Sequence, residues 1–176
     1  MTTIWTPDSA DPSAIPLQLD PREQRMSGHA IHGDTPFDVP FVSQIEGNLW
    51  TGGCAANLVL PVEIEHVVSL YPWEQYTITR EPRSFLLVWL RDADVPPVER
   101  LLPIARWIND CRKDAPTLVH CQAGLNRSGL VAALALILDG MDAQAAIALL
   151  REKRSPAVLC NAGFERWLLG YEAVAA

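Results

Sequence analysis

The stretch from Ala115 to Gly140, "APTLVHCQAGLNRSGLVAALALILDG", most constrains what this chain can fold into. Its first six residues predict a strand that runs into a glycine-bearing loop. From Ser128 onward the residues are apolar on every side, which is typical of a buried helix, and Gly140 is expected to end that helix. This order predicts a layered α/β or α+β domain in which helices cover a sheet. Because ligands bind such sheets beyond the carboxyl ends of strands, we expect the functional site at this loop.

The loop itself places a thiol, small residues and a guanidinium within a few positions of one another. Backbone N–H groups in such a loop can converge and bind an anion at the start of the helix. Arg127 can hold two phosphate oxygens at once, and the positive field favours the reactive thiolate of Cys121. We therefore expect Cys121 to attack a bound phosphate, with Ser128 donating a hydrogen bond to the departing thiolate. His120, on the strand side, is expected to support the loop backbone rather than act as a base. The expected substrate-binding residues are Gln122, Ala123, Gly124, Leu125 and Asn126.

The remaining pattern predicts further strands and helices around this unit. Short runs rich in branched and aromatic residues predict strands at 41–45, 48–52, 66–70 and 84–90. Apolar residues at helical spacing predict helices at 96–114, 142–154 and 161–173, with Asp142 as an N-cap. Pro103 inside the first of these helices implies a kink or a late start.

Residues 1–40 differ in composition from the rest of the chain. Proline recurs there among Asp, Ser, Thr and Gly, so the segment is interpreted as a proline-rich N-terminal extension to a phosphate-binding domain at 41–176. Such a segment buries too little apolar surface to offset its ordering entropy, although Trp5 and Phe37 could dock on the body. The sequence does not decide between a disordered and a docked extension.

The net charge of −7 disfavours nucleic acid, an anionic membrane or another polyanion as the main partner. The chain shows no signal peptide and no apolar run long enough to span a bilayer. Cys54, Cys111 and Cys160 form no CxxC pair and are expected to be structural, although a disulfide that protects Cys121 is conceivable. We expect a cytoplasmic protein with reduced thiols, no metal and no cofactor. The oligomeric state is not indicated.

The string "HCQAGLNRSG" resembles the signature loop of the cysteine-dependent protein tyrosine phosphatases, and most closely the dual-specificity branch. The resemblance extends over residues 45–172 and includes "LWTGG", "VVSL" and "REKRSPAVLCNAGFERWL". It implies an α/β fold with a central mixed sheet flanked by helices. It also implies that Cys121 is the nucleophile of a phosphocysteine mechanism, Arg127 the phosphate clamp and Ser128 the partner of the thiolate.

A phosphocysteine mechanism needs a proton donor for the leaving group. The family places this aspartate on a mobile loop before the cysteine, and "WLRDADVPPVER" (89–100) offers Asp92 and Asp94. We prefer Asp92, because it lies just past the predicted strand and the pattern from Asp92 to Glu99 resembles the family's loop. Asp94 is nearer the next helix and suits a capping role, and it stays the alternative acid. Glu99 is a candidate to brace Arg127, but a solvated helix face explains it better.

The expected substrate is a phosphorylated protein, on phosphotyrosine and also on phosphoserine or phosphothreonine, or a small phosphomonoester; the sequence does not indicate which residue is preferred. The loop carries no lysine, which disfavours lipid phosphates; these and RNA 5′ ends stay alternative substrates. A non-catalytic phosphate-binding module and a rhodanese-type sulfurtransferase are the alternative classes. Tyr71, Trp73 and Tyr76 follow a predicted strand and either border the pocket or pack.

Overall fold

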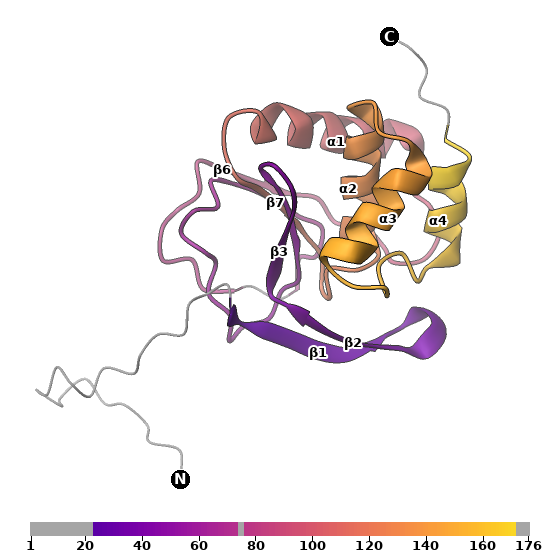
Figure 1. Ribbon diagram of the computed structural model, residues 1–176. Coiled ribbons are helices and arrows are strands. Elements are labelled where there is room, and N and C mark those ends of the chain that lie inside the picture. The colour runs from indigo at the N-terminus through magenta and orange to yellow at the C-terminus, as the bar shows by residue number, and fades with distance from the viewer. Residues whose placement is uncertain (1–22, 74–75, 172–176) are drawn as a thin grey trace, which may run out of the picture.

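The structure, a computed structural model, describes residues 23–73 and 76–171 (Figure 1). Within them, the elements in chain order are β1 (Arg25–Ala30), the short 3-10 helix η3 (His32–Asp34), β2 (Thr35–Pro40), β3 (Val42–Glu46), β4 (Leu49–Gly52), β5 (His66–Ser69), β6 (Ser84–Leu87), α1 (Val98–Arg112), β7 (Thr117–His120), α2 (Arg127–Leu138), α3 (Ala143–Lys153) and α4 (Ala162–Leu169).

The larger sheet of the described chain has five strands in the order β3-β4-β7-β5-β6. β4, β7, β5 and β6 are parallel to one another, whereas β3 pairs antiparallel with β4. This mixed sheet and the helices beside it confirm the fold class that the resemblance implied.

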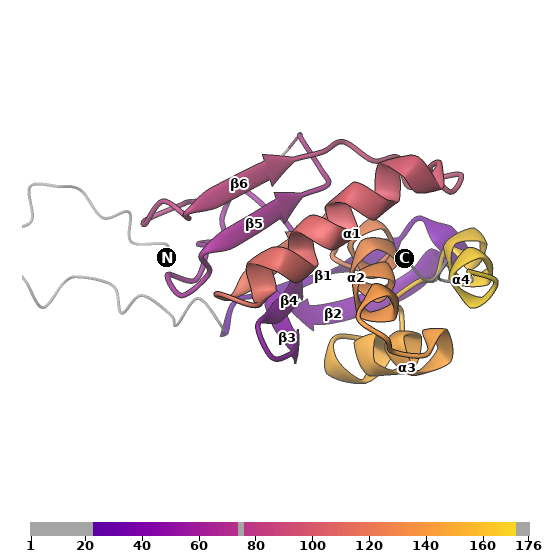
Figure 2. The same cartoon turned by 90° about the horizontal axis from the view of Figure 1, so that it is seen from above.

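The two faces of the sheet are covered in different ways. Val68 and Val119 face a core built with the helices, and α2 contributes an almost completely buried surface to it, as its apolar sequence predicts. Val67 and Leu118 face a second core, which irregular segments close. α1 and α2 pack on the central strands, whereas α4 packs on α2 and α3 (Figure 2). The helices thus lie on one side of the sheet.

Several predicted boundaries shift for local reasons. β6 ends at Leu87, three residues before the predicted strand end, but the N–H groups of Val88 and Leu90 donate to the carbonyls of residues 69 and 70, at and just past the end of β5. α1 begins at Val98 and contains Pro103, so the helix starts after the prolines at 96 and 97 and runs through the third. Gly140, with φ of 99°, follows the end of α2 as expected. Asp142 caps α3 by accepting from the backbone N–H groups of residues 144 and 145.

Part of the predicted extension is folded. β1 and β2 form an antiparallel hairpin in which Gly28 pairs with Phe37. Phe37 does dock on the body, where it packs against the helix-side core, and Trp5 lies outside the described residues. The domain boundary between residues 40 and 41 stays a prediction.

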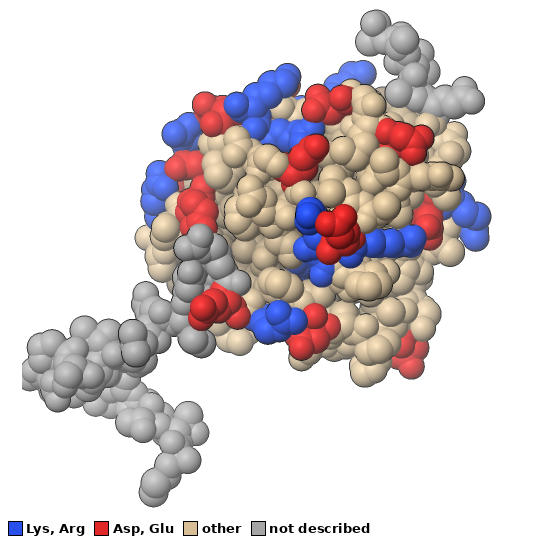
Figure 3. Space-filling view, viewed as in Figure 1, with Lys and Arg blue, Asp and Glu red and all other residues tan. Residues whose placement is uncertain are grey.

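The surface carries charges of both signs. On the face seen in Figure 3, acidic and basic side chains are interspersed rather than gathered into one patch. Among the described residues, no helix has the length and apolar character needed to cross a membrane.

Candidate active site

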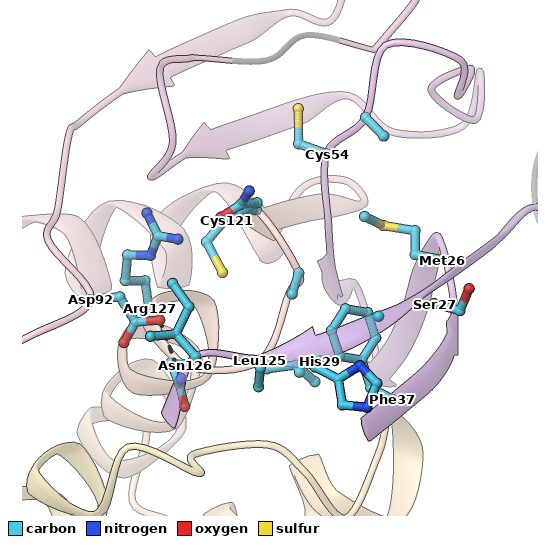
Figure 4. A pocket seen from close by; sticks show the side chains of 16 residues that line it. Met26, Ser27, His29, Phe37, Cys54, Asp92, Cys121, Leu125, Asn126 and Arg127 are labelled. Atoms are coloured by element: carbon cyan, nitrogen blue, oxygen red, sulfur yellow. Dashed lines mark hydrogen bonds between the residues drawn. The ribbon is translucent and has the colours of Figure 1, made fainter. Parts of the chain in front are cut away.

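The predicted site lies at the carboxyl ends of the parallel strands. The loop from Cys121 to Asn126 follows β7, and it lines a cavity of about 240 Å³ together with Asp92, Arg127 and Cys54. The opposite wall is the β1–β2 hairpin, whose residues 26–31 and Phe37 also line the cavity (Figure 4). The structure therefore brings most of the predicted site residues together around one hollow.

The carbonyl groups of the loop are all bound from behind. The Gln122 carbonyl accepts a hydrogen bond from the N–H of Cys54 (2.8 Å). The carbonyls of residues 123 and 124 accept from Arg154 Nη2 (3.0 Å) and Nε (2.5 Å). Those of residues 125 and 126 accept from the N–H groups of Leu159 (3.3 Å) and Leu130 (2.8 Å). A peptide's N–H points away from its carbonyl, so this arrangement turns the N–H groups toward the cavity. None of the N–H groups from 122 to 127 has a hydrogen-bond partner in the described part of the chain. The loop thus has the geometry of an anion site at the start of α2.

Gly124 makes this curvature possible. Its φ is 72°, a left-handed conformation that other residues resist. A Cβ at this position would also collide with the carbonyl oxygen of Gly52 and with the Arg154 guanidinium.

Cys121 lies at the bottom of the loop, with its side chain almost fully buried. Its Sγ is 3.4 Å from Ser128 Oγ, within reach of the hydrogen bond that the sequence predicts. His120 is fully buried, and its Nδ1 lies 3.4 Å from the carbonyl oxygen of Cys121. Burial lowers the pKa of His120 to about 4, because a charged imidazole would lose its hydration, and the contact with the Cys121 carbonyl opposes this shift only weakly. His120 is therefore neutral and lies beside the loop backbone, and its supporting role stays a prediction.

Arg127, the first residue of α2, is held by two groups beyond the loop. Its guanidinium carbon lies 5.2 Å from the centre of the Tyr71 ring, and Nη1 donates to the carbonyl of Leu90 at 3.5 Å. Arg127 Nε is buried and has no hydrogen-bond partner among the described residues. A buried guanidinium with unused donors beside an anion site is suited to holding a phosphate.

A second guanidinium, that of Arg154, supports the loop from behind. Besides the Ala123 and Gly124 carbonyls, Arg154 contacts the carbonyl of Pro40 at 3.1 Å and Ser43 Oγ at 3.2 Å. Burial lowers the pKa of Arg154 to about 10, and the nearby Cys121 opposes that shift, so the group keeps its charge at neutral pH. The sequence prediction missed this residue, although it lies in a segment that resembles the family.

The two candidate acids have different surroundings. Asp92 lines the cavity with its side chain 16% exposed, and it accepts from Asn126 Nδ2 at 3.2 Å and Asn161 Nδ2 at 3.3 Å. Asp94 is exposed and lines a separate hollow beside Trp89 and Arg100. Pro97, rather than Asp94, occupies the N-cap position of α1. This geometry favours Asp92 as the acid.

The aromatic residues, Glu99 and the remaining cysteines, which the sequence left as weaker candidates, have different surroundings in the structure. Tyr71 contacts Arg127, Trp73 is largely exposed against Trp89, and Tyr76 is buried between Phe41 and His120. Glu99 is exposed, as expected of a solvated helix face. None of the four cysteines is in a disulfide, and Cys54 lines the cavity together with Cys121. The described residues contain no cluster of histidine, cysteine and acidic side chains that could hold a metal.

Comparisons with known proteins agree with this geometry. A family model described as "Dual specificity phosphatase, catalytic domain" matches residues 56–174. A Dictyostelium discoideum protein named "Probable protein tyrosine phosphatase type IVA B" is 35% identical over 122 residues, covering 66% of this chain and 68% of that protein. Protein tyrosine phosphatase PRL-1 of Leishmania major is 37% identical over 121 residues, covering 62% of this chain and 68% of that protein.

Solved structures show the same fold. The crystal structure of Tk-PTP in the active form has a TM-score of 0.57 and 25% identity, covering 76% of this chain and 99% of that chain. Human DUSP28 has a TM-score of 0.60 at 19% identity, covering 76% and 93%.

Proposed function

Because the chain belongs to the dual specificity phosphatase catalytic domain family, we propose that it hydrolyses phosphomonoesters on proteins through a phosphocysteine intermediate. One observation carries this proposal. The carbonyls of the loop are bound from behind, which leaves its N–H groups to face the cavity that Cys121 and Arg127 line. Such a site binds a phosphate and presents a nucleophile to its phosphorus.

In the first step the thiolate of Cys121 attacks phosphorus, and the bond from phosphorus to the leaving oxygen breaks. Asp92 donates a proton to that oxygen, which leaves as a neutral alcohol or phenol. The loop N–H groups and Arg127 stabilise the charge on the three remaining phosphate oxygens. The product of this step is a phosphocysteine.

In the second step a water molecule attacks the phosphocysteine. Asp92, now ionised, accepts a proton from the water, and the bond from sulfur to phosphorus breaks. Ser128, 3.4 Å from Cys121, donates a hydrogen bond to the departing thiolate. Inorganic phosphate leaves, and both Cys121 and Asp92 return to their starting states.

Phosphotyrosine is the first substrate that we propose, with phosphoserine and phosphothreonine next. The relatives from Dictyostelium and Leishmania are tyrosine phosphatases by name, which supports this order. The absence of lysine from the loop supports phosphoproteins over phosphoinositides. Cysteines that form no disulfide in the described chain support a reducing, cytoplasmic location.

The test compares the wild type with Cys121→Ser on p-nitrophenyl phosphate, with EDTA present. We expect turnover by the wild type alone, and phosphate on Cys121 when an acid-quenched reaction is analysed by mass spectrometry. The variant should still bind vanadate, because the loop and Arg127 remain. Turnover by Cys121→Ser, or loss of wild-type activity in EDTA, would contradict the proposed mechanism.

A further inference from the structure

The β1–β2 hairpin is fastened at both ends of the cavity. At its base, the side chain of Gln24 bonds to both backbone groups of Val59 at 2.8 and 3.1 Å, and Met26 lies directly over Gly53. Between the two ends, consecutive residues of β1 line the cavity opposite Cys121. The whole hairpin precedes residue 56, where the match to the family model begins.

At the tip of the hairpin, His32 contacts the proposed acid. His32 Nε2 is 2.9 Å from the carbonyl oxygen of Asp92 and 3.1 Å from Asp92 Oδ1. The carbonyl oxygen can only accept, and both oxygens lie closer to Nε2 than the Asn161 Nδ2 donor does at 3.4 Å, which assigns a proton to Nε2. One imidazole N–H therefore faces the main chain and the side chain of Asp92 together, and it restricts rotation of the carboxylate.

The backbone of the tip is shaped to present this imidazole. Gly33 and Asp34, which follow His32, have φ values of 73° and 45°. None of the residues 32–34 is buried, so the turn adds no core packing. His32 thus makes polar contacts with Asp92 and is not part of the hydrophobic core.

Two other residues complete the surroundings of Asp92. Asn126 Nδ2 donates to Oδ2, and Asn161 Nδ2 donates to Oδ1 and, at 3.0 Å, to the carbonyl of Ala93. Asn126 Oδ1 in turn accepts from the N–H of Asn161 at 2.9 Å. Three segments that are remote in sequence thus converge on one carboxylate, and the hairpin supplies one of them.

We propose that His32 is a positioning residue for Asp92, which makes the N-terminal hairpin part of the active site. The inference rests on the proposed role of Asp92 as the acid. A carboxylate that is already held against the cavity needs less ordering when the leaving oxygen arrives, and displacement of a reacting group by about 1 Å can cost on the order of 10²-fold in rate. The rate increase from holding Asp92 in place should be larger for leaving groups that depend more strongly on protonation.

The test uses the full chain and two aryl phosphates. Phenyl phosphate has a poor leaving group, and p-nitrophenyl phosphate has a good one. We expect His32→Ala to lower kcat/KM, which reports phosphocysteine formation, for phenyl phosphate by about tenfold or more, with a smaller loss on p-nitrophenyl phosphate and unchanged vanadate affinity. His32→Gln, which restores an N–H donor, should recover most of the loss. His29→Ala is the control, because His29 is an exposed histidine on β1 of the same hairpin and has no hydrogen bond to Asp92, which His32 contacts.

The outcomes separate the two proposals. Equal losses on both substrates, or no loss, in His32→Ala would overturn the positioning role, provided that Asp92→Asn shows the leaving-group dependence. An Asp92→Asn variant without that dependence would overturn the acid assignment, and the role of His32 with it. Equal losses in His32→Gln and His32→Ala would also count against a role of the imidazole N–H donor.

Discussion

The two walls of the cavity are built in opposite ways. The signature loop, residues 121–127, has every carbonyl from 122 to 126 bound from behind, and it joins a buried strand to a buried helix. The β1–β2 hairpin is attached near its base by Gln24 and Met26 and at its tip by His32. The loop is therefore shaped by its own short sequence and its backing, whereas the hairpin depends on a few contacts that are remote in sequence. We expect substitutions in the loop to affect phosphate binding itself and those in the hairpin to affect what surrounds it.

The largest expected effect lies where the two walls meet, at Asp92. Asp92→Asn should lower kcat/KM for phenyl phosphate by about 10²–10⁴-fold, because kcat/KM reports phosphocysteine formation, in which the leaving oxygen loses its proton donor. The loss on p-nitrophenyl phosphate should be much smaller. Asp94→Asn is the control, since Asp94 lies outside the cavity, and it should behave like the wild type in the same steady-state assays. The reverse pattern would move the acid to Asp94.

Within the loop, Gly124→Ala should cost about 3 kcal/mol of folding free energy or abolish vanadate binding. The added Cβ meets both a left-handed backbone and the carbonyl of Gly52. Gly140→Ala is matched to it, because Gly140 also has a positive φ but open space around it, and it should cost only about 1 kcal/mol. Urea unfolding with and without vanadate measures both variants. Similar costs would mean that the close packing behind the loop contributes little.

Beneath the loop, His120 should make stability depend on pH. Its pKa is about 4 in the folded protein and near 6.5 when unfolded, so between these values the unfolded chain binds a proton that the folded protein does not. This difference removes stability as the pH falls from about 6.5 to 4, by about 3 kcal/mol in total, and nothing further below that window. Urea unfolding across the window should show this loss in the wild type. A His120→Asn variant with the same pH dependence would show that other groups cause it.

The smallest effect is expected in the hairpin. Phe37→Leu should cost about 1 kcal/mol, because a half-buried ring that lies across Gly28 is replaced by a smaller apolar side chain. Vanadate affinity should not change, since Phe37 contributes to the opposite wall and not to the anion site. Isothermal titration with vanadate, alongside thermal unfolding, tests both parts. A large loss of vanadate affinity would mean that the two walls are not independent.

The sequence predicts the loop well because its determinants are local. Strand, thiol, left-handed glycine, arginine and buried helix follow one another within one short segment, and each has its own physical signature. The hairpin has no such local sequence signature, and the prolines at 36 and 40 predicted an irregular extension. β1 and β2 nevertheless pair, because Ala30 and Phe37 reach the helix-side core.

The residues that the sequence prediction missed share one property. His32, Asn161 and Arg154 act through contacts with segments that lie 30 to 129 residues away, and a pattern read along the chain cannot show such contacts. Asn161 illustrates this, since its local role as the N-cap of α4 gives no hint of its bond to Asp92.

Arg154 also has a consequence for how the enzyme responds to its solution. Exposed charges are screened by dissolved ions within about 10 Å at 0.1 M salt, whereas buried charges are screened much less. The charges that act on a phosphate here are the buried guanidinium of Arg127 at the cavity, that of Arg154 behind the loop, and backbone dipoles, not surface lysines. Added salt should therefore weaken the binding of a phosphate dianion less than it would at a site built from exposed charges. This holds although the site belongs to a chain with a net charge of −7.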